Sequence, residues 1–155
     1  MRHWLATLFV FLTALNVQAQ MEEDFASRFM ALHAEKHALE CITVSPLMME
    51  RMLKLPSVEE DGQTKKVLSQ LKSIRMVVNK TAADATECYN KAAELAKRNP
   101  QRYKLYAHNG QRMLYMRRHG GHVVEIVLFM QREQFCLINL TGNMTDKFLE
   151  QVLNI

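Results

Sequence analysis

The chain has 155 residues, of which 48% are hydrophobic, 23% charged and 8% aromatic. This suits one folded domain with a real core and leaves too little chain for two. The 20 Lys and Arg residues against 16 Asp and Glu residues give a net charge of +4. That bias is mild, and no basic stripe with interleaved aromatic residues accompanies it, so nucleic acid is not an expected partner.

The first 19 residues predict a secretory signal peptide. Arg2 and His3 precede an apolar run from Trp4 to Leu15, and the small residue Ala19 stands before an expected cleavage site. The run is too short to stay in a bilayer as an anchor. We therefore expect one domain over residues 20–155, with no transmembrane segment after cleavage, in a periplasmic or secreted location.

The first half of this domain is expected to combine helices with two short strands. Phe25, Phe29 and Leu32 are spaced to share one face of a helix over residues 22–37. Proline, glycine and acidic residues over 56–63 predict a surface loop. The other expected elements are a strand over 39–44, a helix starting at Ser45-Pro46, a helix over 64–71, a strand over 74–78 and a helix that ends at Asn99-Pro100.

The last third predicts a four-strand antiparallel meander followed by a helix over 145–153. Its turns are expected at Asn109-Gly110, Gly120-Gly121 and Arg132-Glu133. Both faces would be apolar, so either helices cover both sides or one face is kept for a partner. Pairing through two-residue turns puts Tyr103, Leu105, Leu114, Val127, Phe129, Ile138 and Leu140 on one face, and Tyr106, Met113, Tyr115, Ile126, Leu128 and Met130 on the other.

The fold class that follows is α+β. We expect the C-terminal four-strand antiparallel meander to be extended by one or two short N-terminal strands and packed with about five helices. The block order resembles one family: ITVSPLMMERML, then SIRMVV, a hairpin, VVEIVLFM and FCLINLTGNM before a final helix. The chain is similar over about residues 25–153 to the exported DUF4252 proteins of Bacteroidetes, a domain of unknown function. This resemblance implies an envelope location and an α+β fold, and it supplies no catalytic residues.

His33 and His37 are the weak metal candidates of the sequence. Their i, i+4 spacing is how one helix presents two ligands on one side. Glu35 lies between them, at neither the position that a zincin needs nor the one that an inverzincin needs. Both imidazoles would border the apolar stripe, where histidine commonly spans core and solvent, so a structural role is the simpler interpretation.

Methionines and cysteines carry less specific signals. Met48, Met49 and Met52 could suit a soft metal, but their spacing equally suits flexible core packing, which we favour. The three cysteines of the expected mature domain are an odd number in an oxidising compartment, which allows at most one intramolecular bridge. We expect Cys41, Cys88 and Cys136 to be unpaired and buried.

Glu125 is the sharpest single oddity, because it lies inside the apolar run from Val123 to Met130. A bare buried carboxylate is costly, so it must be paired, hydrogen-bonded or protonated. In the expected register Arg112 lies diagonal to it on the same face, and a structural ion pair is the favoured interpretation. If the site instead binds a ligand, the candidate residues are Tyr106, Tyr115, Glu125 and Arg112.

These observations favour an exported envelope binding or interaction module over an enzyme. No nucleophile elbow or phosphate-binding glycine loop occurs, so no catalytic residue and no cofactor are assigned. The partner would be an unknown envelope protein or a small ligand. The alternative is an envelope metal-binding protein or hydrolase using His33, His37 and Glu125, which requires these three side chains to converge on one point.

Overall fold

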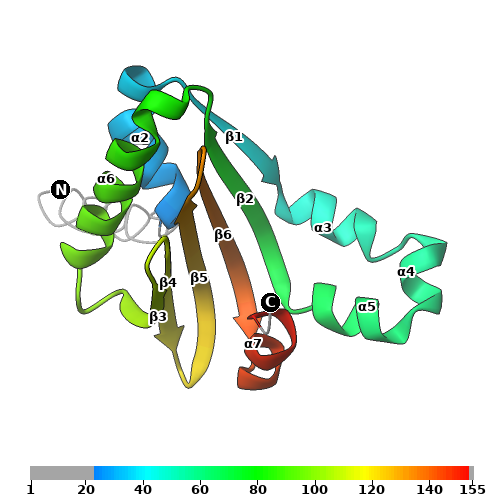
Figure 1. Cartoon of the computed structure of the whole chain (residues 1–155). Helices are drawn as coiled ribbons and strands as arrows, with labels where there is room; N and C mark the ends of the chain where they lie inside the picture. Colours follow the sequence, from blue (N-terminus) through cyan, green and yellow to red (C-terminus); the bar gives the residue numbers. More distant parts are fainter. Residues whose placement is uncertain (1–22, 154–155) are drawn as a thin grey trace, which may run out of the picture.

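The computed structural model describes residues 23–153 and has an α+β fold, as the sequence predicts. A six-stranded sheet forms its centre (Figure 1). The strands are β1 (Leu39–Val44), β2 (Leu71–Asn79), β3 (Lys104–Asn109), β4 (Arg112–His119), β5 (His122–Gln131) and β6 (Phe135–Met144). The helices are α2 (Phe25–His37), α3 (Pro46–Met52), α4 (Pro56–Glu60), α5 (Gly62–Leu68), α6 (Ala85–Lys97) and α7 (Asp146–Leu153), with the 3-10 helix η1 (Ala82–Asp84) before α6.

All neighbouring strands are antiparallel, in the order β1-β2-β6-β5-β4-β3. The four C-terminal strands form the expected meander, and the two N-terminal strands extend it because β2 pairs with β6. Since β3 lies at the far edge, the segment linking β2 to β3 must cross a face of the sheet. Helix α6 lies in this crossover, so the crossing itself supplies part of the cover.

The two faces of the sheet are covered unequally. Helices α2 and α6 bury the main core against one face, to which Val127 and Phe129 contribute. On the other face, Phe148 and Leu149 of α7 pack against apolar side chains of β4 and β5. Elsewhere this second face is more open, and Ile42 is 51% exposed. Helices therefore lie on both sides of the sheet, and the cover of the second face is incomplete.

A β-bulge in β5 decides which side chains share a face. Val123 pairs with Arg118 and Glu125 with Arg117, so Val124 is an extra residue. Such a residue moves the neighbouring side chains to the opposite face relative to the partner strand. The loop between β5 and β6 also has three residues, 132–134, where two were expected. The expected faces were therefore wrong: one face carries Leu114, Ile126, Leu128, Ile138 and Leu140, and the other Met113, Tyr115, Val127 and Phe129.

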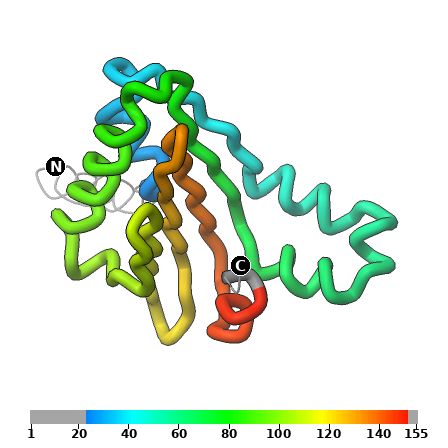
Figure 2. Tube along the Cα trace, in the orientation of Figure 1, coloured from blue at the N-terminus to red at the C-terminus, as the bar shows by residue number. Residues whose placement is uncertain are grey.

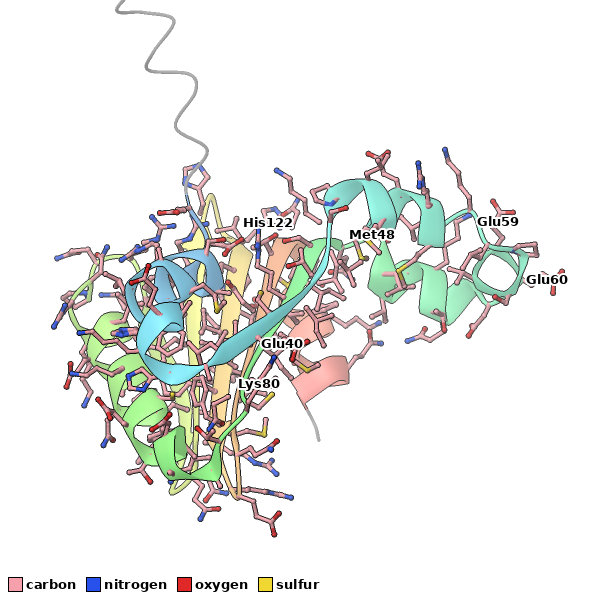
Figure 3. All side chains as sticks on the ribbon, turned by 90° about the horizontal axis from the view of Figure 1, so that it is seen from above. Glu40, Met48, Glu59, Glu60, Lys80 and His122 are labelled. Atoms are coloured by element: carbon pink, nitrogen blue, oxygen red, sulfur yellow. The ribbon has the colours of Figure 1, made fainter. Side chains whose placement is uncertain are left out.

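The connection from β1 to β2 is a helical arm, α3 to α5, that projects from the sheet (Figures 1 and 2). Figure 3 shows Glu59 and Glu60 at its far end. Residues 56–63, expected to be a loop, instead form α4 and the start of α5. Proline at the start of a short helix and an aspartate cap on the next explain this difference. The arm buries Met49 and Val58.

The arm rejoins the sheet through a close backbone contact. A Cβ atom on Gly142 would clash with the carbonyl oxygen of Gln70. The backbone N–H of Asn143 donates to the same oxygen at 2.9 Å, and Thr145 N–H donates to Gln70 Oε1 at 3.0 Å. Only glycine fits at position 142, and the contact fixes the arm to β6 and to the start of α7.

Two further expectations concern the membrane and the cysteines. Within residues 23–153 no helix has the length and apolar character needed to span a bilayer. The expected signal peptide, residues 1–19, lies outside the described residues. Cys41, Cys88 and Cys136 are free cysteines on β1, α6 and β6, but only Cys88 is buried, so the expected burial was wrong for Cys41 and Cys136. Burial raises the pKa of the Cys88 thiol to about 11, so its reactive thiolate is scarce at neutral pH.

Candidate functional site

Side chains from distant strands cap the N-terminus of α2. The first backbone N–H groups of a helix have no partner within the helix. Here Phe25 N–H donates to Glu125 Oε1 at 2.7 Å, and Ala26 N–H donates to Asn139 Oδ1 at 2.8 Å. The N-cap Asp24 accepts the third bond, from Ser27 N–H at 2.8 Å. The start of α2 is thereby tied to β5 and β6.

Glu125 is fully buried, and both of its carboxylate oxygens are satisfied. Oε1 accepts from Phe25 N–H and, at 3.1 Å, from Asn139 Nδ2. Oε2 accepts from Arg117 Nε at 2.9 Å and from the Tyr103 hydroxyl at 3.2 Å. Burial, and then the Glu125 charge, raise the pKa of Tyr103 to about 12, which keeps this hydroxyl a donor. Because both oxygens are fully hydrogen-bonded, Glu125 has a structural role.

The expected ion pair exists, but its partner is Arg117 and the choice of Arg112 was wrong. The bulge at Val124 puts Arg117 directly opposite Glu125, whereas Arg112 pairs with Met130 on the other face. A second arginine, Arg102, has a guanidinium nitrogen 4.0 Å from Glu125 and donates to the backbone carbonyl of residue 23 at 2.8 Å.

Two cavities meet beside this cluster and share Arg117 and Val124 in their linings. One has a volume of about 360 Å³ and lies between the start of α2 and the root of the arm. The other has a volume of about 680 Å³ and is bordered by the segment after α6 and the turn between β4 and β5. We call their union the basic groove, after the side chains of Lys72, Arg75, Arg102, Arg117, Arg118 and His119 that line it.

The basic groove concentrates positive charge. Five Lys and Arg side chains line it, and Asp24 is the one carboxylate among the lining residues. Arg75 Nε donates to Asp24 at 2.8 Å, and Arg118 donates to Asp146 at 2.6 Å, so both guanidinium groups are oriented. A guanidinium has five N–H donors, so an anchored arginine can still donate to an anion. Hydroxyl groups in the same lining come from Thr43, Ser45, Ser73 and Thr141.

The structure does not bring the four expected ligand-binding residues together. Tyr115 is 4% exposed and stacks on Phe129 with ring centroids 5.9 Å apart. Tyr106 is 55% exposed at the bulge in the edge strand β3. Arg112 lies on the face opposite Glu125. Among the four, Glu125 is the one that adjoins the basic groove, through its ion pair with Arg117.

The three residues of the expected hydrolase site also fail to converge. Glu125 binds the first residue of α2, whereas His37 is its last. Twelve residues of helix separate these ends, about 18 Å along the axis. His33 and His37 do lie close together, with ring centroids 6.2 Å apart. Dispersal of the three side chains favours a binding module over a hydrolase built from them.

The methionines of the arm and the histidines of the turn between β4 and β5 lie in the core or at the surface. Of the arm methionines, Met49 is the core residue at 2% exposure, whereas Met48 is 49% exposed, so the expected core packing was wrong for Met48. His119 and His122 face each other as a strand pair at the turn between β4 and β5, and Figure 3 labels the exposed His122.

Sequence reasoning missed Arg117, Asn139 and the groove itself. Arg117 and Arg118 follow directly on the apolar run of β4, and this double arginine was the available signal. Asn139 lies inside the apolar strand β6, a polar interruption much like Glu125 in β5. Two polar residues interrupting neighbouring apolar strands indicate a buried polar cluster.

The comparisons with known proteins give a family and nothing closer. The family model described as "Domain of unknown function (DUF4252)" matches residues 33–152. No curated protein and no solved structure matches the chain significantly.

Proposed function

The chain belongs to the DUF4252 family, and from the geometry of its basic groove we propose that it is an exported cell-envelope module that binds an anionic ligand. The observation that carries this proposal is the concentration of five permanent cations around two adjoining cavities. Three carboxylates pair with these cations, namely Asp24, Glu125 and Asp146, so five positive charges less three negative ones leave the groove a surplus of +2. A surface of one sign raises the local concentration of an oppositely charged ligand.

The fixed positions of two arginines also support the proposal of anion binding. Arg117 is held by a buried carboxylate, and Arg75 by the N-cap of α2. Arginines fixed in this way lose little conformational entropy when they bind, which favours affinity. The cations and hydroxyl groups fit carboxylate or phosphate groups, which an envelope protein or a small ligand could supply.

The binding proposal is tested by nuclear magnetic resonance titration of the protein with citrate and, separately, with pyrophosphate. We expect shifts confined to groove residues, and the double variant Lys72→Gln/Arg118→Gln should bind about tenfold more weakly. The matched control is Lys65→Gln/Lys97→Gln, which removes the same charge outside the groove and should change binding less than about twofold. Shifts spread evenly over the surface, or equal loss in both double variants, would contradict the proposal.

Export is a separate part of the proposal and has its own test. We expect the envelope fraction to hold a chain whose intact mass corresponds to cleavage near Ala19. A mass that retains residues 4–15 would show that the leader is not removed. A location in the cytoplasm would contradict the envelope role, whatever the groove binds.

A further inference from the structure

The opposite end of α2 carries a second polar cluster, which lies apart from the basic groove. His37 is the last residue of α2, Asp84 immediately precedes α6, and Glu87 is in the first turn of α6. The side chain of His37 is 7% exposed, whereas those of Asp84 and Glu87 are 35% and 57% exposed. One buried imidazole therefore meets two carboxylates at the surface.

The buried imidazole of His37 is left incomplete by the described residues. Its Nδ1 atom is buried and has no hydrogen-bond partner among them. The nearest carboxylate oxygens are Asp84 Oδ2, 3.9 Å from Nδ1, and Glu87 Oε1, 3.6 Å from Nε2. Both distances exceed those of a hydrogen bond. A buried histidine nitrogen is normally paired, so Nδ1 is the atom of this cluster that points to a ligand.

The spacing of the three side chains fits a metal ion. One ligand atom from each of His37, Asp84 and Glu87 lies within 4.8 Å of the other two. Two ligands on one tetrahedral Zn²⁺ ion are about 3.4 Å apart, given bonds of about 2.1 Å. An imidazole gives one nitrogen to a metal ion, and the unpaired Nδ1 of His37 lies 3.9 Å from Asp84 Oδ2, which is within about 0.5 Å of this separation. The Thr81 hydroxyl donates to Asp84 Oδ2 at 2.9 Å and so orients that carboxylate.

From these contacts we propose that His37, Asp84 and Glu87 bind a divalent transition-metal cation of the Zn²⁺ class. An imidazole with two carboxylates suits Zn²⁺, whereas Ca²⁺ and Mg²⁺ prefer oxygen ligands alone. His37 and Glu87 also line a cavity of about 280 Å³, which leaves room for water to complete the coordination. The other histidine of that cavity, His33, lies outside the three-residue cluster.

The experiment is a calorimetric titration of the tag-free chain with Zn²⁺, repeated with Ca²⁺ and Mg²⁺. We expect one Zn²⁺ ion per chain, and Glu87→Gln should weaken binding by about tenfold or more. The control is Glu94→Gln, on the same helix and in the same cavity lining, with a side chain 50% exposed. It lies outside the cluster and should leave the affinity unchanged.

Each other outcome overturns the proposal. These outcomes are no Zn²⁺ binding up to about 1 mM, equal weakening by both substitutions, binding that Glu87→Gln does not affect, and preference for Ca²⁺ or Mg²⁺. Glu87 is largely exposed, so its substitution should leave the fold intact, which a thermal melt without metal verifies. The site is independent of the anion-binding groove, so either proposal can fail alone.

Discussion

Helix α2 ends on a buried ionisable side chain at each terminus, and the two ends differ in how that group is satisfied. At the N-terminus, both oxygens of Glu125 are filled by hydrogen bonds from the backbone, Asn139, Tyr103 and Arg117. At the C-terminus, His37 Nδ1 is buried and finds no hydrogen-bond partner in the described part of the chain. The first cluster is complete with protein groups alone, whereas the second has room for another ligand. Burial of a charged group does not by itself mark a site; incomplete pairing is the more informative sign.

The largest loss of stability should come from removing the buried carboxylate of Glu125 from the complete cluster. Glu125→Ala removes the acceptor of Phe25 N–H, of the Tyr103 hydroxyl and of Arg117 Nε, so we expect the unfolding free energy to fall by about 3 to 5 kcal/mol. Urea denaturation measures this change. Glu40→Ala is the control, because the Glu40–Lys80 pair is exposed, with 3.6 Å between charged atoms (Figure 3), and its loss should cost less than about 1 kcal/mol. Equal costs would remove the distinction between the clusters.

A smaller, non-additive effect should identify the partner of Glu125. Arg117→Met leaves the carboxylate without its closest cation, and we expect a loss of about 2 to 4 kcal/mol. Adding Glu125→Gln should recover part of this, because the remaining buried group is then neutral. Arg112 lies on the face opposite Glu125, so Arg112→Met should lower the unfolding free energy by less than about 0.5 kcal/mol. Additive losses in the double variant would contradict a coupled pair.

The incomplete cluster should tolerate loss of its buried group. His37→Leu replaces an imidazole whose Nδ1 has no hydrogen-bond partner within residues 23–153 with an apolar side chain of similar size. We therefore expect unfolding free energy without metal to change by less than about 1 kcal/mol. The same denaturation series measures it. A loss above about 2 kcal/mol would show that the ion pairs to Asp84 and Glu87 already complete this end.

The last prediction concerns pH. The pKa of Tyr103 is about 12 in the fold, raised by burial and by Glu125, against 10 in the unfolded chain. The unfolded chain therefore loses this proton first, and stability should fall as pH rises from about 10 to 12. Tyr103→Phe should show a shallower fall than the native chain, measured by urea denaturation across this range. Parallel curves would exclude Tyr103 as a contributor.

The sequence predicts the elements of this fold better than their register. Hydrophobic periodicity and turn residues locate α2, β1 and the meander, because these signals are local. The bulge at Val124 and the three-residue loop at 132–134 carry no comparable signal, and each shifts the pairing by one residue. This error explains why Arg112 was chosen in place of Arg117. The need of Glu125 for buried partners could be predicted without the register, because a carboxylate inside an apolar strand must be paired wherever its partners lie in the sequence.

The proposed metal cluster also could not be predicted from local sequence patterns. The spacing of His33 and His37 was visible within one helix, but Asp84 and Glu87 lie almost fifty residues later. They meet His37 only because the crossover places the start of α6 against the end of α2. Local spacing finds ligands on one element, whereas this cluster is made by topology. The basic groove is likewise assembled from distant parts of the chain, with lining residues at position 24 and within 43–46, 72–75, 99–102, 117–124 and 141–142.

The caps of α2 also determine when this helix can fold during synthesis of the chain. Its first two N–H groups are paired with residues 100 and 113 positions later in the chain. At about 5 to 20 residues per second, a ribosome needs roughly 5 to 20 s to synthesise the chain between Phe25 and Glu125. Until then the 13 residues of α2 lack these two caps and the strands that supply them, and so short a helix is marginal in water. Helix α2 is therefore expected to fold late, after β5 and β6 have been synthesised.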